Sequence, residues 1–385
     1  MTTMEVEKEV QERCLTCHAA SRSGIPPCLG LAHEVAASSG ATKKGILNFN
    51  TNNRPLSDEE KEKERERACE LLTLSQDICN ARSHAACLDK HVERQTEKAK
   101  DYCCMLSRVL EREEDDLLTC QFKWRTYITA TNGSLDLTIK DVAQELRVAL
   151  ANYAQCVRLN ALQEIDDSRS EEDLAVVCKS VVGELRVAAG ALEAAGNVKT
   201  PKAKAYGIPS EACPSMARSM AKVCLGEAQL VTAHRASLMK LSRPTVSSLY
   251  FGAAQFYEEA TKEIKGNIGE FNEVSEHQMK YLAFCSWLTT ARAIAQMGTH
   301  CREQDQVGEA IATMEASRRF LLKCRPLAED DSAWMEVFQR ECERIIGSLS
   351  KLRKENEIVF FQTEAKAPVQ YPEAKQVVSP LPLEL

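Results

Sequence analysis

Apolar residues recur at helical spacing along much of the chain, most clearly between Ser247 and Leu322. Residues three, four and seven apart lie on one face of an α-helix, so each recurrence marks one apolar stripe. Three stripes stand out: Leu249, Ala253, Phe256 and Ala260; Tyr281, Phe284, Cys285, Leu288 and Ala295; and Val307, Ala310, Ile311, Met314 and Leu321. Helices of this kind cannot bury their stripes alone. The periodicity therefore predicts stacked antiparallel helices, arranged either as an α-solenoid or as an ordinary helical bundle.

The same pattern predicts a mostly α-helical protein. Ser57 with Glu60 three residues later forms a capping box, which is typical of a helix N-terminus. The predicted helices cover about 4–20, 57–80, 83–111, 139–163, 170–195, 211–240, 245–268, 270–299, 304–324 and 331–356.

Three stretches interrupt the helical pattern. Residues 120–129 alternate with period two and are rich in aromatic and β-branched residues, which predicts a strand, and a turn follows at 131–134. The pair Arg325-Pro326 is expected to break the chain between the last two helices. After Phe361, four prolines forbid helix, so we expect residues 363–385 to form an extended tail.

Composition and charge narrow the function classes. The formal net charge of −7 lacks the basic footprint of a general nucleic-acid binder. No apolar run reaches the roughly 20 residues that a bilayer span needs, and the charged N-terminus has no signal-peptide core. These features predict a cytoplasmic chain without a direct membrane anchor. The 17 cysteines are odd in number and scattered over apolar stripes, which favours reduced thiols over a disulfide framework.

Candidate chemistry is sparse. Cys14, Cys17 and His18 match the haem-attachment spacing C-x-x-C-H, but haem c is normally attached in an oxidising compartment. Cys14 and Cys17 could also bind zinc with Cys28 and His33, and this alternative stays open. No nucleophile elbow, phosphate-binding glycine loop or H-E-x-x-H motif occurs. We therefore expect a non-enzyme without cofactor or metal.

Specific fragments favour the solenoid. Ala253 to Tyr257 (AAQFY), Lys280-Tyr281, Gly308 to Ile311 (GEAI) and Lys354 to Gln362 (KENEIVFFQ) follow one another in this order. In that order they resemble the BRO domain family of endosomal-sorting proteins, the Brox type more than the Alix type. The likeness runs from Phe122 onward. It implies an elongated, TPR-like helical solenoid in one domain spanning 1–385: N-terminal helices and loops (1–119), a helical core (120–362) and a tail along the solenoid (363–385).

The resemblance also implies a function. BRO domains are adaptors in endosomal sorting, and a groove on the solenoid receives the C-terminal amphipathic helix of Snf-type ESCRT-III subunits. The matching groove positions here are Lys179, Thr232, Thr245 and Leu249. Thr245 departs from the larger aliphatic residue usual in the family, and Arg147 stands where an asparagine is usual. We expect a monomer recruited to endosomal membranes by partners. The alternative is a generic helical-repeat scaffold that binds other helical or extended peptides.

Overall fold

The computed structural model describes residues 92–111, 122–126, 135–139, 141–168, 171–199, 210–270 and 274–384. The expected helices at 4–20 and 57–80, the candidate zinc residues and the turn at 131–134 lie outside this part of the chain. The α-helices are α3 (Val92–Glu111), α4 (Val142–Asp167), α5 (Glu171–Asn197), α6 (Pro214–Leu238), α7 (Arg243–Gly266), α8 (Glu276–Glu303), α9 (Val307–Leu322), α10 (Arg325–Ala328) and α11 (Ser332–Glu355).

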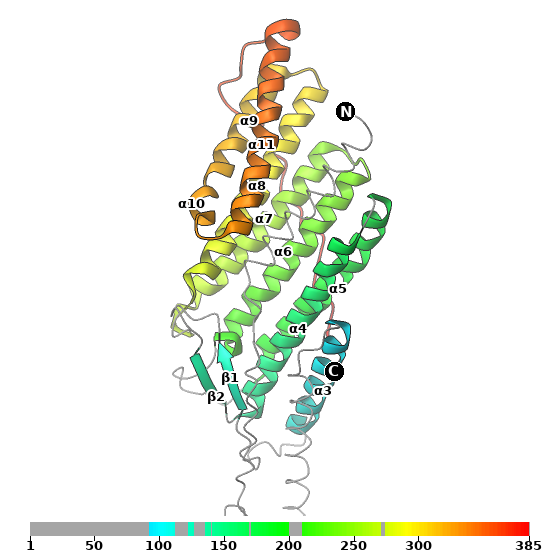
Figure 1. Cartoon of the computed structure of the whole chain (residues 1–385), viewed down its shortest axis with the longest axis vertical. Coiled ribbons are helices and arrows are strands. Elements are labelled where there is room, and N and C mark those ends of the chain that lie inside the picture. Colours follow the sequence, from blue (N-terminus) through cyan, green and yellow to red (C-terminus); the bar gives the residue numbers. More distant parts are fainter. Residues whose placement is uncertain are drawn as a thin grey trace, which may run out of the picture.

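The helices form an elongated stack in which each one packs against its neighbours in sequence (Figure 1). Contacts run from α3 through α4, α5, α6, α7 and α8 to α9, and α11 then packs on α9. A closed bundle would instead bring distant helices around one core. The expected mostly helical solenoid is therefore confirmed. The boundaries of the domain and of its three segments remain predictions.

Local sequence determines where the helices begin. Asp141 and Asp331 cap α4 and α11, and each carboxylate accepts bonds from backbone N–H groups of the first turn, such as Ala143 N at 2.8 Å. Proline occupies the first turn of α6, α7 and α10, where its missing N–H costs nothing. The expected break at Arg325-Pro326 is accordingly the start of the one-turn helix α10.

A two-stranded antiparallel hairpin lies at the lower end of the stack (Figure 1). Strand β1 (Phe122–Thr126) pairs with β2 (Leu135–Ile139), with Phe122 opposite Ile139. The expected strand at 120–129 is confirmed in its central residues. Sequence reasoning missed β2, because its five residues run directly into the helical pattern that follows. Helix α4 consequently begins at Val142 and not at residue 139.

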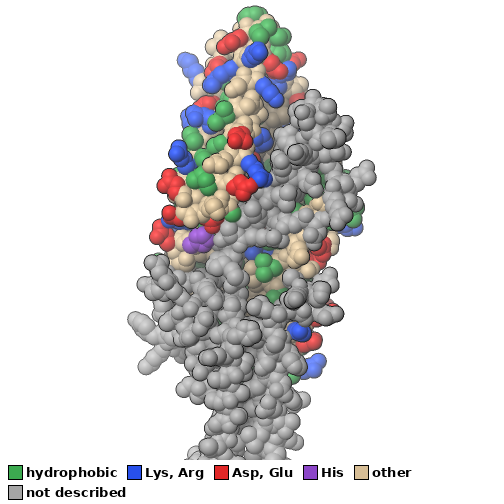
Figure 2. Space-filling view, in the orientation of Figure 1, with side chains coloured by type: hydrophobic (Ala, Val, Ile, Leu, Met, Phe, Trp, Pro, Cys, Tyr) green, Lys and Arg blue, Asp and Glu red, His purple; other side chains and the backbone are tan. Residues whose placement is uncertain are grey.

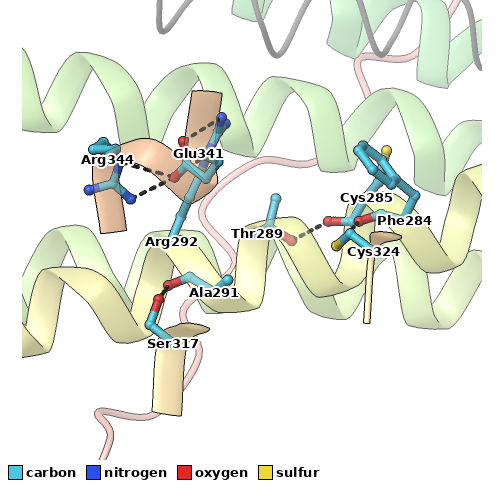
Figure 3. A network of polar contacts seen from close by, with 9 residues as sticks. All are labelled: Phe284, Cys285, Thr289, Ala291, Arg292, Ser317, Cys324, Glu341 and Arg344. Carbon is cyan, nitrogen blue, oxygen red and sulfur yellow. Dashed lines mark hydrogen bonds and ion pairs between the residues drawn. The ribbon is translucent and has the colours of Figure 1, made fainter. Parts of the chain in front are cut away.

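Small residues allow neighbouring helices to approach closely. Buried serines span three successive helix pairs: Ser219 Oγ on α6 donates to the Ala260 carbonyl on α7 at 2.9 Å, and Ser247 on α7 to Ala293 on α8 at 2.8 Å. Ser317 on α9 likewise donates to Ala291 on α8 at 2.6 Å (Figure 3). A hydroxyl reaches a neighbouring backbone carbonyl only when the helices lie close together.

The described cysteines fit the expectation of buried thiols. Cys103, Cys178 and Cys324 are completely buried. Burial raises the pKa of the Cys178 and Cys156 thiols to about 11, so both stay protonated near neutral pH.

A fully buried ion pair joins α4 to α6. Arg158 contacts Glu227 through two nitrogens at 2.6 and 2.5 Å, and the two side chains are 1% and 2% exposed. The Tyr281 hydroxyl on α8 donates to the same carboxylate at 2.9 Å. Burial lowers the pKa of Arg158, but Glu227 outweighs it, so this pKa lies well above its usual value. The three side chains thus connect three helices through one carboxylate.

A second buried carboxylate fixes α11 against α8. Glu341 accepts from Arg292 at 3.2 Å and from Arg344 at 2.6 Å (Figure 3). Burial raises the pKa of Glu341, but the two guanidinium groups outweigh it and hold this pKa well below its usual range.

Removing the carboxylate from the Arg158–Glu227 pair should strongly destabilise the fold. The change Glu227→Ala leaves the Arg158 charge buried, so the free energy of unfolding in urea should fall by about 3–5 kcal/mol. The matched control is Glu263→Ala, which removes the pairing of Glu263 with Arg218, whose side chains are 28% and 40% exposed. That change should cost less than about 1 kcal/mol. Equal losses from the two variants would contradict this account.

The Glu341 site should make stability depend on pH in a defined direction. Because the folded pKa is depressed, its stabilisation is present above the unfolded pKa of about 4.3 and declines as pH falls toward the folded pKa. The unfolding free energies of the wild type and Glu341→Gln should therefore differ most above about pH 5, and the difference should shrink progressively as pH falls below about 4 toward the folded pKa. Chemical denaturation at a series of pH values measures this difference. A difference independent of pH would show that the Glu341 charge does not stabilise the fold.

Candidate partner-binding face

After α11 the chain turns sharply and crosses the stack as an extended tail, residues 363–384. The turn consists of the π-helical segment η4 (Asn356–Phe360) and Phe361, whose φ of 50° is left-handed. Gln362 fixes the turn against the start of α9: its side chain accepts from Gly308 N at 3.0 Å and donates to the Asp305 carbonyl at 2.7 Å. The tail then passes over α9, α7, α6 and α5, and its end lies near α3 in Figure 1.

The solenoid binds the tail mainly through hydrogen bonds to the tail backbone. Lys375 N donates to the Ser248 carbonyl at 3.0 Å, and Ser248 Oγ donates to the Glu373 carbonyl at 2.8 Å. Gln229 donates to the Lys375 carbonyl at 2.9 Å and accepts from Val377 N at 3.0 Å. These hydrogen bonds replace the bonds to water that the tail backbone loses on docking.

The same arrangement recurs on α5 and α9. Arg186 accepts from Leu381 N at 3.0 Å through its carbonyl and donates to the Ser379 carbonyl at 2.7 Å through Nε. On α9, the Gly308 carbonyl accepts from Ala365 N at 3.1 Å, and Thr313 Oγ1 from Val369 N at 3.2 Å. We refer to these contact residues, with three glycines described next, as the tail-binding strip: Arg186, Gly190, Gln229, Ser248, Gly252, Gly308 and Thr313.

Three glycines let the tail backbone touch the helices. A Cβ added at Gly190 would overlap the Leu381 carbonyl, and one at Gly252 would overlap that of Lys375. At Gly308 it would overlap the Thr363 carbonyl. Each glycine lies on a different helix, α5, α7 and α9. The absence of a side chain at these positions is therefore what permits the close contact.

Three of the four predicted groove residues share this face. Lys179 lies seven residues before Arg186 on α5, Thr232 three after Gln229 on α6, and Thr245 three before Ser248 on α7. Such spacing places each on the same side of its helix as a strip residue. Lys179 and Thr245 are exposed and Thr232 is half-buried. Thr232 Oγ1 donates to its own helix at Ala228 O, 2.8 Å, and Thr245 Oγ1 bonds Ser242 Oγ at 2.7 Å.

The fourth predicted residue, Leu249, lies beneath this face. Its side chain is only 6% exposed and packs in a cluster with Ala233 of α6, Val246 and Ala293 of α8. Gln229 Nε2 also donates to the Leu249 carbonyl at 3.1 Å. An aspartate at position 249 would bury an unpaired charge. Loss of binding by Leu249→Asp would therefore report unfolding and not a lost partner contact.

Two residues that sequence reasoning did not explain acquire roles here. Arg147 is 8% exposed and extends from α4 to the carbonyls of Ala212, at 3.3 Å, and Val198, so it satisfies the backbone at both ends of the α5–α6 connection. Gln229 is completely buried yet contacts the tail through both atoms of its amide. In the sequence, Gln229 stands out as a polar residue on an apolar stripe, which indicates a buried hydrogen-bonding role. Its partners in the tail can be identified only when the path of the tail is known.

The surface charge at the end of the stack that carries α8, α9 and α11 is mixed. Figure 2 shows Lys and Arg side chains interspersed with Asp and Glu over the upper part of the molecule, without a field of one sign. Within the described ranges, His, Cys, Asp and Glu form no group of three or more that could hold a metal ion. None of the described helices combines the length and apolar character that crossing a bilayer requires.

Curated relatives and solved structures resemble this chain. The BRO1 domain-containing protein BROX of Pongo abelii and that of Homo sapiens are each 22% identical over 285 residues, which cover 68% of this chain and 65% of the relative. The chain therefore matches just under two thirds of their length. The ALIX BRO1 domain in complex with CHMP4C superposes with a TM-score of 0.63 at 17% identity, covering 82% of this chain and 86% of the other.

Two further solved structures share the fold. ALIX in complex with the SIVmac239 PYKEVTEDL late domain has a TM-score of 0.63 at 17% identity, over 89% of this chain and 47% of ALIX. A Bro1 domain described as a basis for endosomal targeting has a TM-score of 0.60 at 16% identity, over 80% and 82% of the two chains. The BRO1-like domain family model matches residues 56–384, which extends well before Phe122, where the sequence likeness was expected to begin. Because this match takes in most of the sequence, the chain belongs to the BRO1-like domain family.

Proposed function

We propose that this chain is a non-catalytic adaptor in ESCRT-linked endosomal sorting. In this proposal it binds the C-terminal amphipathic helix of a Snf-type ESCRT-III subunit. Family membership and the ALIX BRO1 domain solved with CHMP4C support an ESCRT-III partner. The proposal includes a monomeric adaptor that partners recruit to endosomal membranes. A binding partner supplies that recruitment without any anchor in the described helices.

The observation that carries this proposal is the shared face of α5, α6 and α7. Lys179, Thr232 and Thr245 come from three consecutive helices, and each lies three or seven residues from a strip residue of its own helix. A partner helix laid on this face would meet the partly buried Phe251 of α7, which now contacts Tyr371 of the tail, and the exposed Lys179 at its edge. Helix-in-groove recognition needs this combination, because apolar anchors give affinity and rim charges give orientation.

Leu249 has an indirect role in this proposal. Its buried side chain fills the space between α6, α7 and α8 and so supports the floor of the groove. Thr245, one turn before it, is the residue whose side chain is exposed to a partner. A threonine there offers less apolar surface than an aliphatic residue, which favours a weaker interaction than a larger side chain would give.

The alternative function is a scaffold for other helical or extended peptides outside the ESCRT pathway. Docking of the chain's own extended tail on this face is the observation that favours it. The two functions differ in ligand conformation, because an amphipathic helix presents one apolar side, whereas an extended peptide presents its backbone. Binding of ESCRT-III C-terminal helices therefore separates them.

Enlarging the apolar surface at position 245 should strengthen ESCRT-III peptide binding. Burying an additional aliphatic side chain contributes about 1.5 kcal/mol, so Thr245→Ile should lower the Kd roughly tenfold. Thr261→Ile is the matched control, because residue 261 lies on the same helix but on its opposite side. Isothermal titration with the C-terminal helix of an ESCRT-III subunit measures both. An unchanged Kd for Thr245→Ile, or an equal gain for the control, would place the groove elsewhere.

Lys179 should contribute a rim charge. The exposed Lys179 ammonium can pair with an acidic side chain of the peptide, and such a pair contributes about 1 kcal/mol or less. The change Lys179→Ala should therefore raise the Kd by no more than about fivefold and reduce its dependence on salt. Lys265→Ala removes an exposed lysine from the far end of α7 and should leave both quantities unchanged. An identical salt dependence for the wild type and Lys179→Ala would exclude this role.

A further inference from the structure

The tail contacts the solenoid with a regular alternation. Between residues 373 and 381, the backbone groups that bond to the tail-binding strip belong to every second residue: Glu373, Lys375, Val377, Ser379 and Leu381. This period of two is that of an extended strand. The helices thus provide acceptors and donors at the spacing that an extended backbone requires.

The side chains at the hydrogen-bonded positions of this segment face away from the solenoid, whereas Val378 between them packs against it. Glu373, Lys375, Val377 and Ser379 are exposed although their backbones are bound. The side-chain hydrogen bond from this stretch joins Gln376 to Glu259 at 2.9 Å. The glycines of the strip reinforce this preference, because they admit a peptide carbonyl whatever side chain it carries. The strip therefore selects an extended conformation, with freedom at the exposed positions and an apolar side chain at the inward-facing position of Val378.

Proline favours the same conformation. Pro372, Pro380 and Pro382 fix φ and lack N–H groups, and none occupies a position whose N–H donates to the strip. A proline-containing segment is already extended before it binds, so docking orders fewer backbone torsions. Tyr371 adds one aromatic contact, with its ring 5.6 Å from that of Phe251.

From this geometry we propose that the part of the tail-binding strip on α5, α6 and α7 is a binding site for extended, proline-containing segments of partner proteins. The chain's own residues 368–384 are its resident ligand, and a partner segment takes their place. This site lies on the same face of α5, α6 and α7 as the groove proposed for an amphipathic helix, but it binds an extended backbone and not the apolar stripe of a helix. The tethered tail competes at a high effective concentration, so an incoming segment must outcompete it.

Cleaving the tail after folding tests this proposal in the full chain. A specific protease site replaces residues 364–367, of which Glu364, Lys366 and Ala367 are exposed, and the folded protein is cut there. A fluorescent peptide of residues 368–385 should then exchange onto the cut protein with saturable, one-to-one binding, measured by fluorescence polarisation. The uncut protein should bind this peptide at least tenfold more weakly. Absence of exchange on the cut protein would overturn the proposal.

Peptide variants separate backbone from side-chain recognition on an unchanged protein. Methylation of the Lys375 and Val377 amide nitrogens removes two donors and should weaken binding at least tenfold. Alanine at the exposed positions 373, 375, 376, 377 and 379 should change affinity by less than threefold. An otherwise unrelated peptide that keeps the proline spacing together with Val378 and Leu383 should still compete. The opposite ranking, with alanine disruptive and methylation harmless, would exclude a backbone-reading site.

Protein variants provide a matched pair of glycines on one helix. Gly190→Ala places a methyl group where the Leu381 carbonyl lies. This change should weaken binding of the 368–385 peptide at least tenfold. Gly183→Ala adds a methyl group with nothing within 4 Å and should leave peptide affinity unchanged. Circular dichroism checks that both variants fold. Equal peptide affinities for the two variants would contradict the proposed contact. These measurements use no ESCRT-III peptide, so their outcome is independent of the helix-binding function.

Discussion

Close approach of neighbouring helices is the constraint on which this structure depends. In this stack each helix buries its apolar stripe mainly against the adjacent helices, so every layer must pack tightly. Ala188, Ala189 and Ala191 on α5 are completely buried, and Ser219 and Ser247 donate directly to carbonyls of the next helix. Larger residues at these positions would separate the layers. Small residues are also needed on the outer face, where glycines allow the backbone of the tail to approach the helices.

Polar groups inside the stack add specificity that apolar packing alone does not supply. Alanine-rich stripes can slide past one another by a turn at small cost, because their surfaces are alike. The Arg158–Glu227–Tyr281 group and the Glu341 group each allow one register, since a shift would leave a buried charge without its partner. These groups join α4, α6 and α8, and α8 to α11. Together they fix the positions of α4, α6, α8 and α11 relative to one another, and with α6 the position of Gln229 under the tail.

The sequence predicts the helices better than the surfaces they form. Periodicity finds each of the long helices α4 to α9 and α11, because in a helix of 16 to 28 residues the spacing of the apolar positions repeats several times. It fails for β2 and α10, which are shorter than one clear repeat. Family resemblance places Leu249 among groove residues, yet its side chain packs in the core. Adjacent residues on a helix point about 100° apart, so Leu249 is buried although Ser248 beside it contacts the tail. The tail-binding strip could not be predicted from the sequence because it binds the tail through backbone hydrogen bonds. Gly190 and Gly252 allow the tail to come close, but a glycine in a helix does not by itself indicate a binding site.

The tail and the candidate groove are physically joined through Gln229. Its Nε2 donates both to the Lys375 carbonyl and to the Leu249 carbonyl, while its Oε1 accepts from Val377 N. With the tail in place the amide is completely buried. Departure of the tail opens the amide to water, so its two bonds to the tail are exchanged for bonds to water while the bond to the Leu249 carbonyl remains. Thr232 lies one turn along α6 from Gln229, so a helix that binds beside Thr232 and Thr245 lies close to the path of the tail. By thermodynamic reciprocity, a partner helix that changes tail affinity by some factor has its own affinity changed by the tail by that factor.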